Sequence, residues 1–312
     1  MTSDFEYIVP QELIDQYEQD GVVLIEQPFD ASWVNRLLDE YERIVEEWRN
    51  GSTEYPVREQ NGAISVQNVI LRSSVYRDWA VNSPIAEIVA QVIKSDSIRF
   101  YFDNFFVKQG DKPETETPLH QDVPAFGFQG AQLPSAWLAL TDVDMDNAPL
   151  LTALGSHKDQ SFMFRSPIQK PGLDLLPGYR EPSEIEAYIQ EHGYELKAWS
   201  AKKGDLILIC PYTIHGAMQR KSGAGTRIGF SSRWIGDDVR WHGTIYNEVE
   251  ASTHPRALKD GELPPEEMMP VVWRRNEGNL ARLDGRFTSH VTLEPKGNPE
   301  VNFKPANLKA TS

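Results

Sequence analysis

The segment Thr117-Pro118-Leu119-His120-Gln121-Asp122-Val123-Pro124 places a histidine and an aspartate two residues apart. Side chains two residues apart in an extended chain point to the same side, so His120 and Asp122 would converge on one point. Two ligands do not fix an ion for catalysis, so a third must come from a distant strand. His215, in Cys210-Pro-Tyr-Thr-Ile-His215-Gly216, is the best candidate. Two imidazoles and one carboxylate form the facial set that leaves positions on Fe(II) open for oxygen chemistry.

The His-x-Asp pair alone is a weak signal. With seven histidines in the chain and aspartate at roughly 6% of an average protein, about 0.4 such pairs arise by chance. His120 could instead cap a surface loop near Asp122, and His215 could be a structural histidine of the core. The position of His215, after a continuous apolar run and before a glycine, favours the ligand interpretation.

Composition limits the partners of this chain. It has 312 residues, a formal net charge of -15 and a single cysteine, Cys210. The negative charge disfavours nucleic acid and anionic membranes, so we expect a small-molecule substrate, while the oligomeric state stays open. One cysteine excludes internal disulfides and Cys-based metal sites. No apolar run reaches membrane-spanning length and the N-terminus lacks a signal-peptide pattern, which predicts a cytoplasmic protein.

The order of periodicities predicts the fold. Helical patterns gather in the first 96 residues, and strand patterns dominate afterwards, with no alternation of strands and helices. This combination predicts an α+β chain with a mainly β core, a double-stranded β-helix (a cupin-like jelly roll) flanked by N-terminal helices. The expected helices cover 10–21, 30–51, 83–93 and 183–193, and the expected strands cover 22–25, 63–66, 98–109, 135–143, 206–210 and 226–234.

The whole chain, 1–312, is predicted to be a single domain. Residues 1–96 would form helical support, and residues 97–245 the jelly-roll core with an insertion at 158–200. Residues 246–312 would be peripheral. Loops that interrupt a scaffold often cover its binding site, so the insertion and Trp241 are candidates for closing the mouth of the barrel.

A polar face is expected on the strand Thr226–Trp234. Alternation places Arg227, Gly229, Ser231 and Arg233 on one side. If this side lines the barrel, Arg227 is buried and requires an anion, for which a carboxylate is the matching partner. A dicarboxylate co-substrate could present one end to Arg227 and chelate the metal with the other. The alternative is an arginine on a surface strand.

Candidate substrate contacts come from the strand before the metal segment and from the residues just after it. One face of the strand carries Phe102, Asn104, Phe106 and Lys108, and Phe126 and Phe128 follow the segment. The aromatic rings suit an apolar or flat substrate, although the same residues on the opposite face would be core.

The motifs, taken in order, resemble the phytanoyl-CoA dioxygenase family of Fe(II)- and 2-oxoglutarate-dependent oxygenases. The similarity extends over roughly residues 8–245 and is carried by these motifs: His120-Gln121-Asp122, Trp137-Leu-Ala-Leu-Thr-Asp142, Gly155-Ser156-His157-Lys158, Gly204-Asp205 to His215, Arg227, and Arg233-Trp-Ile-Gly-Asp-Asp238-Val-Arg240.

The resemblance implies a role for several residues. His120, Asp122 and His215 would bind iron, and Arg227 would bind the distal carboxylate of 2-oxoglutarate. Trp137 and Lys108 are the further co-substrate candidates. His157 is expected to structure its loop, and Arg233, Asp237, Asp238 and Arg240 are expected to form an ion-paired turn.

The implied activity is oxidation of an unactivated C–H bond of a metabolite, usually by hydroxylation, with O2 consumed and succinate and CO2 released. Halogenating relatives lack the carboxylate ligand, so Asp122 argues against halogenation. Desaturation, epoxidation and cyclisation stay open. Two further alternatives are a cupin-like isomerase or hydrolase that uses Zn or Mn, and a non-catalytic jelly-roll binding module.

Overall fold

The computed structural model describes residues 7–53, 55, 57–60, 63–109, 116–165, 178–241, 259, 261–264, 266 and 269–280. The helices are α1 (Gln11–Asp20), α2 (Ala31–Arg49), α3 (Ser74–Asn82), α4 (Ile85–Ile93) and α5 (Ile185–His192), with short 3-10 helices η1 (Val69–Leu71), η2 (Val123–Ala125), η3 (Ser156–Lys158) and η4 (Pro182–Glu184). The strands are β1 (Val22–Ile25), β2 (Val57–Gln60), β3 (Ala63–Gln67), β4 (Ser97–Lys108), β5 (Thr117–His120), β6 (Phe128–Gln129), β7 (Ser135–Ala139), β8 (Leu150–Ala153), β9 (Met163–Phe164), β10 (Tyr179–Arg180), β11 (Leu196–Trp199), β12 (Leu206–Ile209), β13 (His215–Ala217), β14 (Arg227–Ile235), β15 (Arg240–Trp241), β16 (Val271–Arg274) and β17 (Gly278–Asn279).

Two antiparallel sheets form the core, as the sequence predicted. The major sheet runs β1-β12-β7-β14-β4, and β4 is long enough for β3 and β16 to pair with different parts of its outer edge. The minor sheet runs β11-β8-β13-β5. The two sheets enclose an apolar layer that includes Trp137, Leu150 and Ile207, and the polar site lies between the same two sheets.

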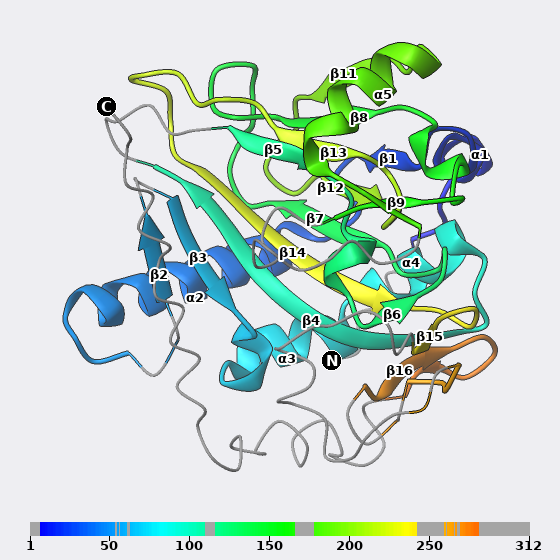
Figure 1. Ribbon diagram of the computed structural model, residues 1–312. Coiled ribbons are helices and arrows are strands. Elements are labelled where there is room, and N and C mark those ends of the chain that lie inside the picture. The colour runs from blue at the N-terminus through cyan, green and yellow to red at the C-terminus, as the bar shows by residue number, and fades with distance from the viewer. Residues whose placement is uncertain are drawn as a thin grey trace.

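The N-terminal helices cover the outer face of the major sheet, the face turned away from the minor sheet (Figure 1). In α2 the Asp30 side chain accepts a hydrogen bond from Ser32 N at 2.7 Å and caps the helix. Apolar residues at helical spacing, such as Leu37, Tyr41 and Ile44, are buried in the main core cluster. Gly21, at φ 74, ends α1 in the left-handed conformation.

The structure corrects several sequence expectations. The segment 158–200 is not wholly an insertion, because Leu196–Trp199 pairs with β8 as the edge strand of the minor sheet. The helix expected over 183–193 is preceded by a capping box that Glu181 and Glu184 form. The C-terminal segment is not wholly peripheral, because β16 joins the major sheet.

Other differences concern the length of one strand, one helix that was not predicted, and expectations for residues that the structure does not describe. The strand expected at 135–143 ends at Ala139, and α3 was not predicted. Residues 246–258 and 281–312 of the segment expected to be peripheral lie outside the described residues. In the described part of the chain, every helix is too short or too polar to span a bilayer.

Candidate active site

His120 and His215 lie opposite each other on neighbouring strands of the minor sheet. They form a register pair between β5 and β13, and their ring centroids are 4.4 Å apart. Asp122 faces both rings: its Oδ1 lies 3.7 Å from His120 Nε2 and 3.8 Å from His215 Nε2. The structure therefore brings the three residues together, although His215 follows His120 by 95 positions in the sequence.

Asp122 reaches this position by a turn, not by the extended geometry expected from the sequence. Strand β5 ends at His120, and Asp122 has helical dihedrals of φ -77 and ψ -38 at the start of η2. The backbone N–H groups of Asp122 and Val123 both donate to Pro211 O at 3.1 Å, which ties the turn to the loop before His215. The two histidine-bearing segments are thus held against each other by the main chain.

Hydrogen bonds fix which ligand atoms face the centre. His120 Nδ1 lies 2.8 Å from Pro118 O, and His215 Nδ1 lies 2.9 Å from Thr213 O. A carbonyl oxygen accepts only from a protonated Nδ1, so each Nε2 keeps its lone pair for a metal. Ser135 Oγ donates to Asp122 Oδ2 at 2.5 Å and leaves Oδ1 directed at the two imidazoles.

The electrostatics of the three residues suit a cation. Burial alone would raise the pKa of Asp122, but the charges of His215, His120 and Arg233 and the His120 hydrogen bond hold it well below its usual range. Burial and the neighbouring charge of His120 lower the pKa of His215 to about 4. Burial also opposes the charged form of His120, but the bond and charge of Asp122 outweigh it and raise its pKa. One aspartate and a histidine that resists protonation form a ready cation site.

The separations fit one metal ion. Two ligand atoms that each lie ~2.1 Å from an ion are at most about 4.2 Å apart. The two Asp122 to histidine distances, 3.7 and 3.8 Å, fall within this limit. The donor set of nitrogen, nitrogen and oxygen is that of the facial triad of non-haem iron enzymes. His157, by contrast, lies against Gly21, with its Nε2 3.2 Å from Glu18 O.

A second polar pocket surrounds Arg227 on β14. Arg227 and Lys108 are both buried and face each other across β14 and β4. The Arg227 guanidinium carbon lies 5.4 Å from the centre of the Trp137 ring, and one of its nitrogens donates to Ala148 O. Trp137 Nε1 is buried and has no hydrogen-bond partner in the described part of the protein. Two buried cations beside an unsatisfied N–H group make a cradle for an anion.

Gly229 makes room for this pocket. A Cβ atom at Gly229 would lie 2.3 Å from the Trp137 ring, so only glycine lets the indole approach the β14 backbone this closely. Ser135 and Trp137 are two residues apart on β7, which corresponds to about 7 Å along the strand. The metal position beside Ser135 and the anion cradle beside Trp137 are therefore within the reach of a short dicarboxylate.

The substrate candidates fall into two groups. Phe102, Asn104 and Phe106 share the site-facing side of β4, because their register partners on β14 are Arg233, Ser231 and Gly229. Phe106 is 38% exposed and lies toward solvent.

Phe126 and Phe128 pack differently from the β4 residues. The Phe126 ring contacts the Phe102 ring at 5.6 Å. Phe128 is fully buried, and its ring contacts those of Tyr101 and Trp241. Both rings therefore belong to one cluster with Tyr101 and Phe102, and only Phe126 contacts the Phe102 ring.

The sequence expectation for Arg233 was wrong. Arg233 belongs to β14 and is buried, and no ion pair joins it to Asp237, Asp238 or Arg240 within the described residues. The carboxylates of Asp237 and Asp238 instead accept hydrogen bonds from Ser97 and from the Ala131 and Gln132 backbone. The strand alternation that placed Arg233 beside Arg227 was the signal that could have identified it.

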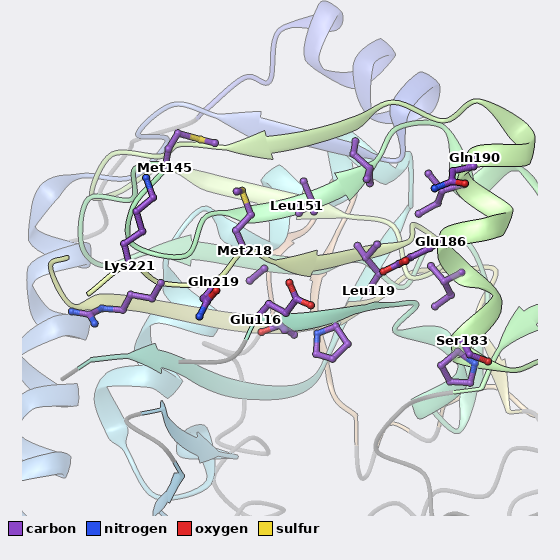
Figure 2. A pocket seen from close by; sticks show the side chains of 18 of the residues that line it. Glu116, Leu119, Met145, Leu151, Ser183, Glu186, Gln190, Met218, Gln219 and Lys221 are labelled. Atoms are coloured by element: carbon purple, nitrogen blue, oxygen red, sulfur yellow. The ribbon is translucent and has the colours of Figure 1, made fainter. Parts of the chain in front are cut away.

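A surface groove lies apart from the His-Asp-His centre. It measures about 980 Å³ and is lined by residues of β5, β8, α5 and the loop after β13, among them Leu119, Leu151, Glu186, Met218 and Lys221 (Figure 2). Leu119 and Leu151 alternate with His120 and Thr152, whose side chains point between the sheets, so the groove is on the outer face of the minor sheet. It is separate from the His-Asp-His centre.

Comparison with solved structures supports the fold. The non-haem α-ketoglutarate-dependent carbocyclase SnoK from nogalamycin biosynthesis aligns with a TM-score of 0.66 at 16% identity, over 84% of this chain and 96% of its own. The epimerase SnoN, solved with Fe3+, α-ketoglutarate and nogalamycin RO, aligns with a TM-score of 0.63 at 20% identity, over 84% of this chain and 97% of its own. EctD from S. alaskensis, solved with 2-oxoglutarate and 5-hydroxyectoine, aligns with a TM-score of 0.61 at 17% identity, over 85% of this chain and 88% of its own.

Sequence comparison identifies one relative and one matching family. Peroxisomal phytanoyl-CoA dioxygenase of Bos taurus is 26% identical over 151 residues, which are 48% of this chain and 41% of the bovine protein. The match therefore spans less than half the length of that relative. The family model of phytanoyl-CoA dioxygenase matches residues 17–229, which contain His120, Asp122, His215 and Arg227. The chain belongs to the phytanoyl-CoA dioxygenase family.

Proposed function

We propose that this Fe(II)- and 2-oxoglutarate-dependent dioxygenase hydroxylates an unactivated C–H bond of a small-molecule metabolite and releases succinate and CO2. The observation that carries the proposal is the convergence of two imidazole Nε2 atoms and Asp122 Oδ1 between the two sheets. The unpartnered Trp137 Nε1 and the buried Arg227 guanidinium beside it support a dicarboxylate co-substrate.

The residues divide the work. His120, Asp122 and His215 hold the iron, and Pro118 O, Thr213 O and Ser135 Oγ keep their ligand atoms aimed at it. Iron with 2-oxoglutarate and O2 supplies the oxidant that removes hydrogen from the substrate.

The co-substrate is held by a separate group of residues. Arg227 binds its distal carboxylate, with Trp137 and Lys108 at the sides of the cradle. The apolar residues between the sheets, such as Ile207 and Leu150, keep water from the reacting atoms.

The substrate would occupy the open side of the site. Phe102, Asn104 and Phe106 line the site-facing side of β4, with Phe126 packed against Phe102 and Phe128 in the same cluster. The structural relatives include a carbocyclase and an epimerase, so the same first step can lead to products other than an alcohol. Mass spectrometry of the product separates the outcomes: hydroxylation adds one oxygen, whereas cyclisation or desaturation removes two hydrogens. The cytoplasmic location and the single-domain organisation over residues 1–312 stay predictions.

Succinate formation under O2 with Fe(II), 2-oxoglutarate and ascorbate tests the proposal. Asp122→Ala removes a ligand and should abolish turnover. Arg227→Met removes the guanidinium and should raise the 2-oxoglutarate concentration for half-maximal rate by about tenfold or more, because a buried carboxylate loses its charged partner. His192→Ala, which alters a histidine on α5, should behave as wild type.

The rival functions give different results in the same assay. A Zn or Mn isomerase or hydrolase of the cupin type would act without O2 or 2-oxoglutarate. A non-catalytic binding module would bind its ligand equally well after His120→Ala. Wild-type succinate formation in both the Asp122 and Arg227 variants would contradict the assignments.

A further inference from the structure

Arg233 is a buried cation beside the metal centre, and no carboxylate among the described residues lies within ion-pair distance of it. It is 5% exposed and lies on the same face of β14 as Arg227. Its register partner on β7 is Ser135, whose hydroxyl binds Asp122. The guanidinium therefore lies near the His-Asp-His centre and not in the surface turn after β14.

The hydrogen bonds of Arg233 are incomplete. Its Nη1 donates to Ser231 O at 3.1 Å, and its Nε is buried without a partner. Neither Nε nor Nη2 donates to any group in the described part of the chain, and no carboxylate there lies within 4 Å. An arginine presents two parallel N–H groups along its Nε and Nη2 edge, which is the geometry that binds a carboxylate at two points.

Within the part of the chain that the structure describes, no carboxylate compensates this charge at close range. Asp103 lies on the other side of β4, where its carboxylate accepts from Val69 N and Ile70 N. Asp122 is nearby, but a bound metal ion would use its charge. The charge of Arg227 is already matched to the co-substrate. The positive charge of Arg233 is therefore available to a ligand other than the metal ion and the co-substrate.

The residues around Arg233 indicate the chemistry of that ligand. The guanidinium carbon lies 4.8 Å from the centre of the Phe102 ring and 5.6 Å from that of Phe106. Phe106 is partly exposed, so the Phe102 and Phe106 rings connect the guanidinium to the outside. A ligand that enters here meets two aromatic rings and then a free edge of hydrogen-bond donors.

We infer that Arg233 binds a carboxylate of the primary substrate, and that the substrate is a hydrophobic organic acid whose apolar body packs on Phe102 and Phe106. This inference rests on the proposed function, because it assigns the open side of the same centre. Arg227 and Arg233, six residues apart on one face of one strand, then have different ligands. The first binds the co-substrate and the second binds the substrate.

Paired probes test the inference. Protein loaded with Fe(II) and 2-oxoglutarate under nitrogen has its Arg227 cradle filled, and calorimetry with 4-phenylbutanoate and with the neutral 4-phenylbutanamide measures the effect of charge alone. Wild type should bind the acid about tenfold or more tightly than the amide, because truncating one partner of a buried charge pair has at least this effect. Arg233→Met should remove the preference for the acid, and Arg233→Lys should keep part of it.

Three controls separate local from general effects. Binding of the amide by Arg233→Met shows that its pocket is folded. The half-saturating 2-oxoglutarate concentration should shift less than twofold in Arg233→Met but strongly in Arg227→Met. Arg36→Met, which alters an exposed arginine on α2, should keep the acid preference.

Two outcomes overturn the inference. One is a wild type that shows no preference for the acid, including one that binds neither probe, and the other is an Arg233→Met variant that retains the preference. Failure of the proposed function is a separate result: wild type would then produce no succinate from 2-oxoglutarate, whichever probe it binds.

Discussion

Ser135 determines which oxygen of Asp122 faces the metal position. Its hydroxyl donates to Oδ2 at 2.5 Å, and Oδ1 is left 3.7 and 3.8 Å from the two histidine nitrogens. Outer partners of this kind orient a ligand before the metal arrives. Single atoms that never touch the ion thus control its binding.

Ser135→Ala should weaken Fe(II) binding by about tenfold to a hundredfold, because the Asp122 carboxylate is then free to rotate. Titration with Fe(II) under nitrogen measures the affinity. Ser161→Ala is the matched control, since Ser161 also donates to an aspartate, Asp159, but on an exposed loop. Equal affinities of the Ser135 variant and wild type would show that Asp122 needs no such support.

Gly229→Ala should disturb the co-substrate cradle. The added Cβ would lie 2.3 Å from the Trp137 ring, so the indole must move away from Arg227. We expect the half-saturating 2-oxoglutarate concentration to rise by about tenfold. Gly225→Ala is the control, because a Cβ at Gly225 meets no atom within 4 Å. A Gly229 variant that uses 2-oxoglutarate as wild type does would place the cradle elsewhere.

Sequence reasoning identified single residues when their signal was local. The spacing of His120 and Asp122 and the alternation around Arg227 were visible in short segments. The roles of Ser135 and Arg233 depend on strand pairing between β7 and β14, which no short segment encodes. Arg233 was misassigned because two aspartates follow it closely in sequence, whereas its actual neighbours come from distant strands.

At the scale of elements, β4 carries different functions on its two faces. Phe102 and Asn104 face the site, whereas Asp103, between them, faces the helices and is fully buried. Its carboxylate accepts from Val69 N at 2.7 Å and from Ile70 N at 3.0 Å and anchors η1. Burial outweighs these hydrogen bonds and raises the pKa of Asp103 to about 7.

The contribution of Asp103 to the stability of the protein should therefore decrease as pH rises toward neutrality. The folded state binds the Asp103 proton more tightly than the unfolded state, whose aspartate has a pKa near 3.8. The contribution is complete below about pH 4 and is lost as pH rises through about 7. Asp103→Asn should remove this component, so its stability relative to wild type should increase from pH 4 to pH 8.

Urea unfolding at several pH values measures the difference between wild type and Asp103→Asn. Asp15→Asn, at an exposed position on α1, serves as the control. A difference that stays constant with pH would mean that Asp103 is ionised in the folded protein at all these pH values.

Elements with local signals were predicted well. Asp30 before an apolar helical repeat and Gly21 after one mark α2 and α1 correctly. Strand β11 was missed because Leu196–Trp199 is only four residues long and follows a helix in a segment rich in proline and glycine. Its identity comes from pairing with β8, which is a long-range property.

At the scale of the whole molecule, the minor sheet separates the His-Asp-His centre from the outer groove. Its inner face carries His120 and His215, and its outer face forms the groove of about 980 Å³ beside α5 (Figure 2). The jelly-roll class and the N-terminal helices were predicted from the order of helical and strand patterns along the chain. This order can be read without knowing which strands pair with each other. Which face of the minor sheet carries the metal centre and which carries the groove was not predictable, since it depends on the register of strands far apart in sequence.

Leu151→Gln tests whether the outer groove takes part in the reaction. Leu151 lines the outer groove and alternates with Thr152, which faces inward. The substitution should leave succinate formation within about twofold of wild type, since none of His120, Asp122, His215 and Arg227 lines the groove. A large loss of turnover in a variant that unfolds at the wild-type urea concentration would assign the groove a part in the reaction.

The most direct test of the account is a titration of the protein with Fe(II) and then 2-oxoglutarate under nitrogen, monitored by visible absorption. Chelation of Fe(II) by a 2-oxo acid produces a charge-transfer band. We predict one Fe(II) per chain and a band that saturates at one 2-oxoglutarate per iron in wild type, no band in Asp122→Ala, and a band that requires far more 2-oxoglutarate in Arg227→Met. A wild type without the band, or an Asp122→Ala variant that shows it at full strength, would contradict the assignment of this centre.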